Sequence, residues 1–233
     1  MPVVLEQNLG AVRQRIAQAA TANGREAGTV LLLAVSKTRS ADDVRAAHAA
    51  GCRDFGENYV QEGELKILEL AKLRLCWHFI GPIQSNKTRV IAEHFDWVHS
   101  VDRLKIAERL SQQRDDDAEP LQICIQVNIS NEESKGGVTV AELPELAAGI
   151  AALPRLTLRG LMAIPAPTAD PDEQRRAFAA VRTEFESLRQ RLPQLGPQFD
   201  TLSMGMSGDL EAAIAEGATI VRVGTDIFGA RTT

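Results

Sequence analysis

The chain has 233 residues, of which 44% are hydrophobic and 24% charged, and its formal net charge is −5. This composition predicts a globular protein with a large core and disfavours nucleic acid as a partner. The chain does not start with a basic segment followed by an apolar one, and no apolar run approaches membrane-spanning length. We therefore expect one cytoplasmic domain over residues 1–233, with no membrane partner.

The cysteines and histidines are scattered along the chain. Isolated cysteines in an odd number are typical of reduced thiols in the cytoplasm and not of a disulfide framework. None of the histidines pairs with a cysteine or a carboxylate at the spacing of metal ligands, so the sequence predicts no metal site. The residues concerned are Cys52, Cys76, Cys124, His48, His78, His94 and His99.

Taken in chain order, the predicted elements alternate between helix and strand. Apolar residues from Leu5 to Ile16 recur at helical spacing and predict an N-terminal helix that closes near Asn23. Strands are expected at 31–38, 53–55, 75–80, 95–100, 121–129, 156–164, 199–203 and 219–223. Helices are expected between them at 40–50, 60–70, 84–94, 102–114, 140–153, 171–192 and 209–216. This alternation matches a single (β/α)8 TIM-type barrel with one extra N-terminal helix. A doubly wound sheet is the alternative, but no glycine-rich turn follows the first strand.

The first strand ends in Lys37. The run before it is apolar throughout, which is typical of a parallel strand buried on both faces, and the C-terminal edge of such a strand is where barrels carry their chemistry. A lysine partly withdrawn from water there holds more of the neutral amine that attacks a carbonyl. The alternative is an ordinary strand-end lysine with its ammonium in solvent.

A helix start is expected directly after this strand. Ser40 and Asp43 have the spacing of a capping box and predict the start of the next helix.

Lys37 is the one lysine that follows a buried strand, whereas other lysines are expected on helix surfaces. These others are Lys66, Lys72, Lys87 and Lys105.

The loops after the seventh and eighth strands are rich in small residues and hydroxyls. In a barrel these two loops meet on one face, where backbone N–H groups can approach a phosphate and a hydroxyl adds a donor. Each loop alone fits an ordinary glycine-rich turn equally well, and Asp209 would repel a phosphate if it faced the same way. The candidate residues for binding a phosphate are Ser203, Met204, Ser207, Gly224 and Thr225.

Arg222 interrupts the apolar eighth strand, and a buried guanidinium needs a partner. One interpretation is a structural ion pair with a carboxylate such as Asp200. The other is donation to a ring nitrogen of a ligand that lies between the two loops and Lys37. Further polar residues at or near strand ends are candidate wall groups, although each alone is often a satisfied structural residue. They are Asn58, His78 and Asn128.

A lysine that can form an imine, two phosphate-binding loops and an arginine facing a ring together describe a site for pyridoxal 5′-phosphate. The sequence also resembles the pyridoxal phosphate homeostasis protein family, from about Leu5 to Arg231. The resemblance rests on the stretches AVSK at 34–37, FGENYVQE at 55–62, HFIGPIQSNK at 78–87, GLMAIP at 160–165, LSMGMS at 202–207 and RVGTDIFG at 222–229.

The resemblance implies a barrel like the N-terminal domain of bacterial alanine racemases, with the cofactor as an aldimine on Lys37. It also implies that Ser203, Gly224 and Thr225 hold the phosphate and that Arg222 faces the pyridine nitrogen. The family is regarded as one of cofactor-binding proteins that balance vitamin B6 and amino-acid pools, without an established catalytic reaction. Relatives often end in a basic tail, whereas residues 230–233 read ARTT, so we do not carry over a role of such a tail in holding or passing on the cofactor.

Three functions remain open: a cofactor carrier, a racemase or other pyridoxal enzyme, and a Schiff-base aldolase in which Glu57 serves as acid or base. Racemases of this architecture use a tyrosine base from a second domain, whereas Tyr59 is the single tyrosine of this sequence. We therefore expect a non-catalytic, monomeric protein that binds pyridoxal 5′-phosphate and has apo pyridoxal enzymes as candidate recipients.

Overall fold

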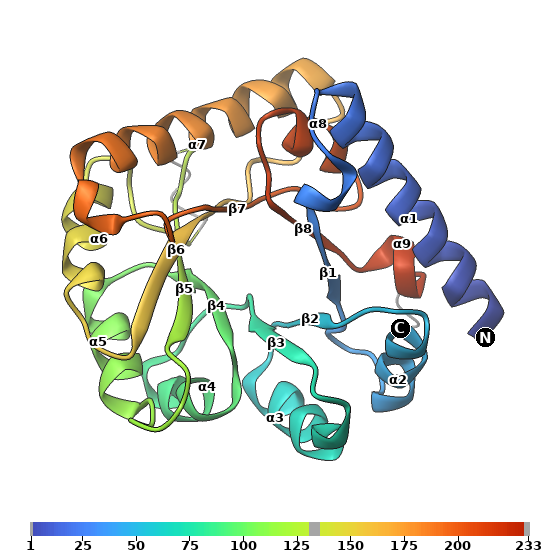
Figure 1. The fold of residues 1–233 in the computed structure, drawn as a ribbon, viewed down its shortest axis with the longest axis horizontal. Coiled ribbons are helices and arrows are strands. Elements are labelled where there is room, and N and C mark those ends of the chain that lie inside the picture. Colours follow the sequence, from blue (N-terminus) through green and yellow to red (C-terminus); the bar gives the residue numbers. More distant parts are fainter. Residues whose placement is uncertain (1, 131–135, 231–233) are drawn as a thin grey trace.

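The computed structural model describes residues 2–130 and 136–230, which form a closed barrel of parallel strands surrounded by helices (Figure 1). Neighbouring strands pair in sequence order, and the last strand pairs with the first. The predicted (β/α)8 barrel is therefore confirmed. The strands are β1 (Leu31–Val35), β2 (Asp54–Glu57), β3 (Cys76–Phe79), β4 (Trp97–Val101), β5 (Leu121–Gln126), β6 (Leu156–Met162), β7 (Thr201–Ser203) and β8 (Ile220–Val223).

Helices cover the outside of the barrel and connect its strands. They are α1 (Pro2–Ala22), α2 (Ala41–Ala49), α3 (Val60–Glu69), α4 (Thr88–His94), α5 (Leu104–Gln113), α6 (Leu143–Ala151), α7 (Pro171–Arg191), α8 (Leu210–Ala215) and α9 (Thr225–Phe228). The predicted N-terminal helix is α1, which buries Leu9 and Ile16 and lies beside α8 and α9 (Figure 1).

β1 shows why the strands read as continuous apolar runs. Leu33 and Ala34 are neighbours in sequence and therefore face opposite sides of the sheet, yet both are fully buried. One side packs into the barrel interior and the other packs under the helices. A strand with two dry faces needs apolar residues at every position.

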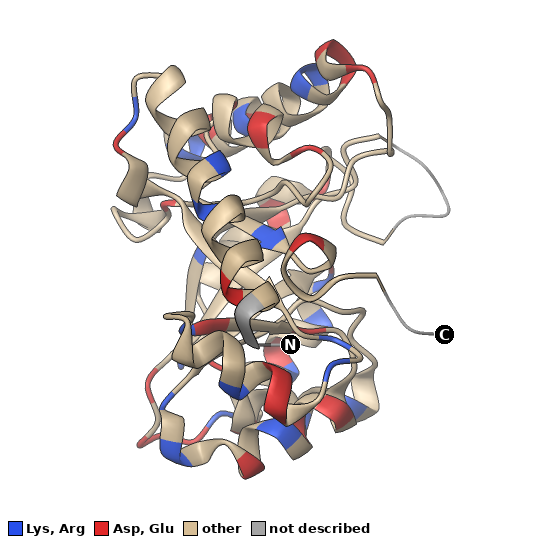
Figure 2. Ribbon diagram, turned by 90° about the vertical axis from the view of Figure 1, so that its right-hand side faces the viewer, with Lys and Arg blue, Asp and Glu red and all other residues tan. Residues whose placement is uncertain are grey.

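Acidic and basic residues are interspersed along the outer helices (Figure 2). Arg15 on α1 is one of the cations that tie helices together. Its guanidinium contacts Glu211 at 2.7 Å and Asp226 at 2.6 Å, and it donates to the carbonyl of Ser207 at 2.9 Å. One side chain of the extra helix therefore holds the segments that follow β7 and β8.

The predicted capping box of α2 is present. Ser40 Oγ accepts from the Asp43 N–H at 3.1 Å, and Asp43 Oδ2 accepts from the Ser40 N–H at 3.0 Å. These bonds satisfy two N–H groups that have no acceptor within the helix.

Some predicted elements have different bounds. The helix expected over 84–94 begins as a 3-10 turn (Ser85–Lys87), and α4 starts at Thr88. The strand expected over 121–129 ends at Gln126, because Val127 pairs with Val138 in a single bridge. Most of the loop expected over 132–137 and the C-terminal residues 231–233 lie outside the described residues.

Among the described residues, no helix combines the length and the apolar character needed to cross a bilayer.

We expect Ser40→Ala to lower the free energy of unfolding by about 1 kcal/mol, because it removes the acceptor that caps α2. Urea denaturation followed by circular dichroism measures this change. Ser40→Thr keeps the hydroxyl and should retain most of the stability. Equal losses in both variants would show that the cap does not stabilise the helix.

Candidate functional site

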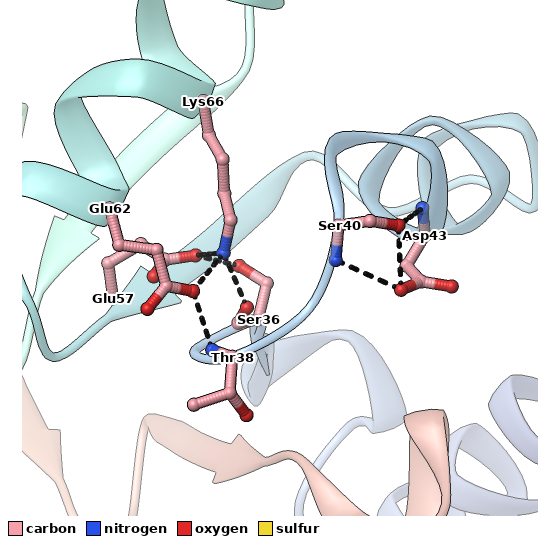
Figure 3. Close-up of polar contacts among 7 residues, drawn as sticks. All are labelled: Ser36, Thr38, Ser40, Asp43, Glu57, Glu62 and Lys66. Carbon is pink, nitrogen blue, oxygen red and sulfur yellow. Dashed lines mark hydrogen bonds and ion pairs between the residues drawn. The ribbon is translucent and has the colours of Figure 1, made fainter. Parts of the chain in front are cut away.

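Lys37 follows β1 at the carboxyl end of the barrel, and its side chain is half-buried. Side chains of α3 hold the backbone on both sides of it (Figure 3). Lys66 Nζ donates to the Ser36 carbonyl at 2.7 Å, and the Thr38 N–H donates to Glu62 Oε1 at 2.6 Å. Thr38 has a φ of 62°, in the left-handed region that β-branched residues rarely adopt. The bond from Thr38 therefore stabilises a strained turn that sets the direction in which the chain leaves Lys37.

Lys66 lies at the centre of a buried ion-pair cluster, so the prediction that it is a surface lysine is wrong. Its Nζ contacts Glu57 Oε1 at 2.8 Å and Glu62 Oε1 at 2.6 Å, and only 6% of the residue is exposed. Two carboxylates and a carbonyl replace the water that the ammonium loses. The sequence did not reveal this, because the partner Glu57 comes from a different element than Lys66.

Glu57 ends β2 and is fully buried against α3. Its Oε1 accepts from the Ser36 hydroxyl at 2.6 Å and from Lys66, and burial raises the pKa of this carboxyl above its ordinary value. Ser36 thus faces α3, and alternation along an extended chain directs the next residue, Lys37, to the opposite side. The geometry therefore gives no support to Glu57 as the acid or base of an aldolase.

Arg222 is buried in β8 and contacts oxygen atoms of β7 and of the segment after β6. Its Nη1 donates to the carbonyl of Ser203 at 2.5 Å and to Ser203 Oγ at 3.0 Å, and Nη2 donates to the Ala163 carbonyl at 3.0 Å. Asp200 instead pairs with Arg159 at 2.8 Å, so the alternative of an ion pair between Arg222 and Asp200 is wrong. Burial lowers the pKa of Arg222 to about 10, which leaves the guanidinium charged at neutral pH.

Ser203 and Met204 do not fit direct phosphate binding by their polar groups. Ser203 is fully buried, and its Oγ is shared between Arg222 and His99 Nδ1, which lies at 2.7 Å. Met204 belongs to the core, and its N–H donates to the Ile220 carbonyl at 3.1 Å. Loop composition predicted both positions, but it does not reveal that their polar groups already have partners on β4 and β8.

The remaining candidates for phosphate binding lie on two adjoining segments. Ser207 is half-buried in the loop after β7. Gly224 lies against the end of β1, where a Cβ would come within 3.2 Å of the Val35 carbonyl. Thr225 opens α9, whose first N–H groups have no acceptor within the helix. Asp209 accepts from the Met206 N–H at 2.5 Å and so closes the loop after β7 with its carboxylate.

Asn58 follows β2 and has a side-chain acceptor that is not paired within the described residues. Its Oδ1 is buried and has no hydrogen-bond partner within the described residues. Gly81 fixes the position of Asn58, because a Cβ at Gly81 would come within 2.1 Å of the Asn58 carbonyl. Buried polar atoms are nearly always paired, so this oxygen fits a site that a donor on a ligand completes. The Asn128 N–H donates to the carbonyl of Val138 at 2.9 Å.

His78 lies inside the barrel, deeper than a wall group at its mouth. Its Nδ1 lies 2.9 Å from His99 Nε2, and its Nε2 lies 3.2 Å from Asp54 Oδ1 and 3.3 Å from Cys76 Sγ. No local sequence pattern marks His99 as a site residue, although it stands among the buried residues of β4. Asp54, Cys76 and His78 are the one group of described residues whose potential metal-ligand atoms lie within 4.8 Å of one another.

Comparison with known proteins assigns the chain to a family. Residues 7–232 match the family described as "Alanine racemase, N-terminal domain". The chain is 61% identical over 227 residues to the pyridoxal phosphate homeostasis protein of Pseudomonas aeruginosa, covering 97% of this chain and 96% of that protein. It is 54% identical over 230 residues to the protein of the same name from Escherichia coli, covering 97% of each. The chain belongs to the pyridoxal phosphate homeostasis protein family. The resemblance drawn from its motifs is thereby confirmed.

Solved structures agree with this family membership. PipY from Synechococcus elongatus, determined with pyridoxal phosphate bound, is 39% identical with a TM-score of 0.84, over 97% of this chain and 100% of PipY. Alanine racemase from Corynebacterium glutamicum is 18% identical with a TM-score of 0.71, over 99% of this chain and 62% of the racemase. The second likeness shows the fold alone.

We expect Lys66→Met to lower the free energy of unfolding by about 3–5 kcal/mol, because it leaves the buried Glu57 carboxylate without its cation. Burial raises the pKa of Glu57 above its ordinary value of 4.5, and only the ionised form needs a cation. The loss should therefore grow as the pH rises from that value towards neutrality. Urea denaturation at two pH values measures it. Lys72→Met, at an exposed position, is the matched control, and similar losses in the two variants would contradict the prediction.

Proposed function

We propose that this protein binds pyridoxal 5′-phosphate at the carboxyl end of its barrel through Lys37 and acts in vitamin B6 homeostasis as a carrier without catalysis of its own. The observation that carries the proposal is the fixed position of Lys37, whose flanking peptide groups are both held by α3. The names of its relatives and the bound ligand of PipY support the cofactor.

The residues at this end of the barrel fit the chemical groups of the cofactor. Ser207, Gly224 and Thr225 offer hydroxyl and backbone donors beside the strand that carries Lys37, as a phosphate requires. Asn58 Oδ1 is a buried acceptor that lacks a partner among the described residues. When bound, the cofactor supplies an electrophilic aldehyde and an electron-withdrawing ring. In this proposal Lys37 provides the amine that holds the aldehyde carbon.

Arg222 is the residue that we assign to the ring nitrogen. A guanidinium can only donate, so it keeps a nitrogen that it faces unprotonated and weakens the ring as an electron sink. This property suits a carrier, which must not activate the bonds of the amines it meets.

A pyridoxal-dependent racemase-like enzyme or a Schiff-base aldolase is the second candidate, because proteins of the same fold include an alanine racemase and a D-threonine aldolase. Two features favour the carrier. Tyr59, the single tyrosine of the sequence, is 56% exposed, and Glu57 is engaged with α3. We further propose that apo pyridoxal enzymes receive the cofactor and that the carrier is a monomer.

Borohydride reduction of the cofactor-loaded protein should leave the reduced cofactor covalently attached to Lys37, because that amine holds the aldehyde. Peptide mapping by mass spectrometry identifies the labelled lysine. Lys87→Arg is the control and should leave the reduced cofactor on Lys37. If the reduced cofactor is found mainly on another lysine of freshly loaded protein, the assignment to Lys37 is wrong.

Arg222→Gln should still bind the cofactor but shift its absorption spectrum, because the charged donor next to the ring is lost. Arg159→Gln alters an arginine that pairs with Asp200 away from the site and should leave the spectrum unchanged. A folded, loaded Arg222→Gln protein with the wild-type spectrum would show that Arg222 does not face the ring.

Loaded wild-type protein should transfer its cofactor to an apo pyridoxal enzyme and should turn over no common amino acid. Incubation with a panel of L- and D-amino acids, followed by chiral chromatography, tests for catalysis. Sustained racemisation, decarboxylation or transamination with many turnovers per site would favour the enzyme over the carrier. A protein that binds no cofactor would exclude the carrier and the racemase.

A further inference from the structure

A row of polar side chains crosses the interior of the barrel from Arg222 to the start of β2. Arg222 Nη1 donates to Ser203 Oγ at 3.0 Å, and Ser203 Oγ lies 2.7 Å from His99 Nδ1. His99 Nε2 lies 2.9 Å from His78 Nδ1. His78 Nε2 in turn lies 3.2 Å from Asp54 Oδ1. One link of the row, from Ser203 to His99, joins strands that are not neighbours in the sheet, because β5 and β6 lie between β4 and β7.

The two ends of this row determine its direction. A guanidinium only donates hydrogen bonds, and an ionised carboxylate only accepts them. With one hydrogen atom in each link, Ser203 donates to His99 Nδ1, and His99 Nε2–H donates to His78 Nδ1. His78 Nε2–H then donates to Asp54. Each imidazole therefore carries one proton, on Nε2.

Burial disfavours any other arrangement of these protons. Ser203, His78 and His99 are all fully buried. In the reverse direction His78 Nε2 and Asp54 would be two acceptors 3.2 Å apart, and only the weak S–H donor of Cys76, 3.3 Å from His78 Nε2, could pair with that nitrogen. The Ser203 hydrogen would also need another partner. Unsatisfied groups of this kind are expensive in a dry interior. Burial also holds the pKa of His99 well below its ordinary 6.5, in keeping with the neutral ring that this direction requires.

We propose that His99, whose tautomer is set by His78, is a positioning residue that holds Arg222 for the ligand through Ser203. Because the Ser203 hydrogen is given to His99, the hydroxyl oxygen is left to accept from Arg222. Within the described residues, Arg222 uses three hydrogen bonds, to Ser203 O, Ser203 Oγ and Ala163 O. A guanidinium has five N–H donors, so its remaining donors are available to a ligand. This part of the inference rests on the proposed function, whereas the direction of the row does not.

At the Asp54 end of the row, a bound metal ion is the one alternative to the hydrogen bond from His78 to Asp54. A metal ion bound by Asp54, Cys76 and His78 would take the lone pair of His78 Nε2. The proton of His78 would then lie on Nδ1, and the whole row would run in the opposite direction. The position of one proton therefore distinguishes the two arrangements.

Nitrogen-15 NMR of the cofactor-free protein tests the direction. The chain has four histidines, and His48→Gln and His94→Gln remove the two outside the row. We expect both remaining rings to show a protonated Nε2 and an unprotonated Nδ1 at neutral pH. A protonated Nδ1 on His78 or His99, or a doubly protonated ring, would overturn the proposal. A His78 resonance that moves on addition of Zn²⁺ alone, with Nδ1 protonated, would point to the metal site instead.

A pair of variants tests the effect on the ligand site. His99→Leu removes the acceptor for Ser203 and should weaken pyridoxal phosphate binding by about tenfold, as expected for one hydrogen bond to a charged group. It should also shift the cofactor spectrum. His99→Asn places an amide oxygen near the position of Nδ1 and should restore both properties although the link to His78 is lost. A merely structural role would not give this rescue.

Several outcomes would contradict the inference. A folded His99→Leu protein with wild-type affinity and spectrum would show that the row does not act on Arg222. If His99→Leu does not fold, a His99→Asn protein with a strongly altered spectrum would have the same meaning. If wild-type protein binds no cofactor, the proposed function fails, but the proton positions in the cofactor-free protein still decide the direction of the row.

Discussion

The pairing of β8 with β1 is the constraint on which the site depends. Leu33 pairs with Arg222, and Ala34 pairs with Val223, so segments from opposite ends of the sequence lie side by side. The same closure presses Gly224 against Val35, two residues before Lys37. The lysine, the arginine and the glycine-containing loop can therefore gather at one mouth only in a closed barrel.

Two buried polar systems fix the important groups from opposite sides of the sheet. The cluster around Lys66 lies outside the barrel under α3 and holds the backbone at Lys37. The row through His99 lies inside the barrel and reaches Arg222 through Ser203. Each system gives hydrogen bonds to buried charged groups, and its members come from different elements of the fold. A site built in this way is organised before a ligand arrives.

The sequence was sufficient to predict the barrel and the placement of Lys37, because both follow from apolar periodicity and from the rule that chemistry gathers at strand ends. The direction of side chains was harder to predict. Ser203 and Met204 belong to a loop motif by sequence, but both are buried and their polar groups are bonded within the barrel. Lys66 and His99 were missed as parts of the polar systems, since their partners lie on other elements and no local pattern reveals a long-range contact.

Arg15 links the N-terminal helix α1 to the segments that follow β7 and β8. It bridges α1 to Glu211, to Asp226 and to the Ser207 carbonyl, and these groups belong to the segments after β7 and β8. The contacts of α1 are therefore complete only when the segments after β7 and β8 have folded against it. A chain that lacks these segments leaves the Arg15 guanidinium without its two carboxylates, so α1 gains these contacts only when the barrel is closed.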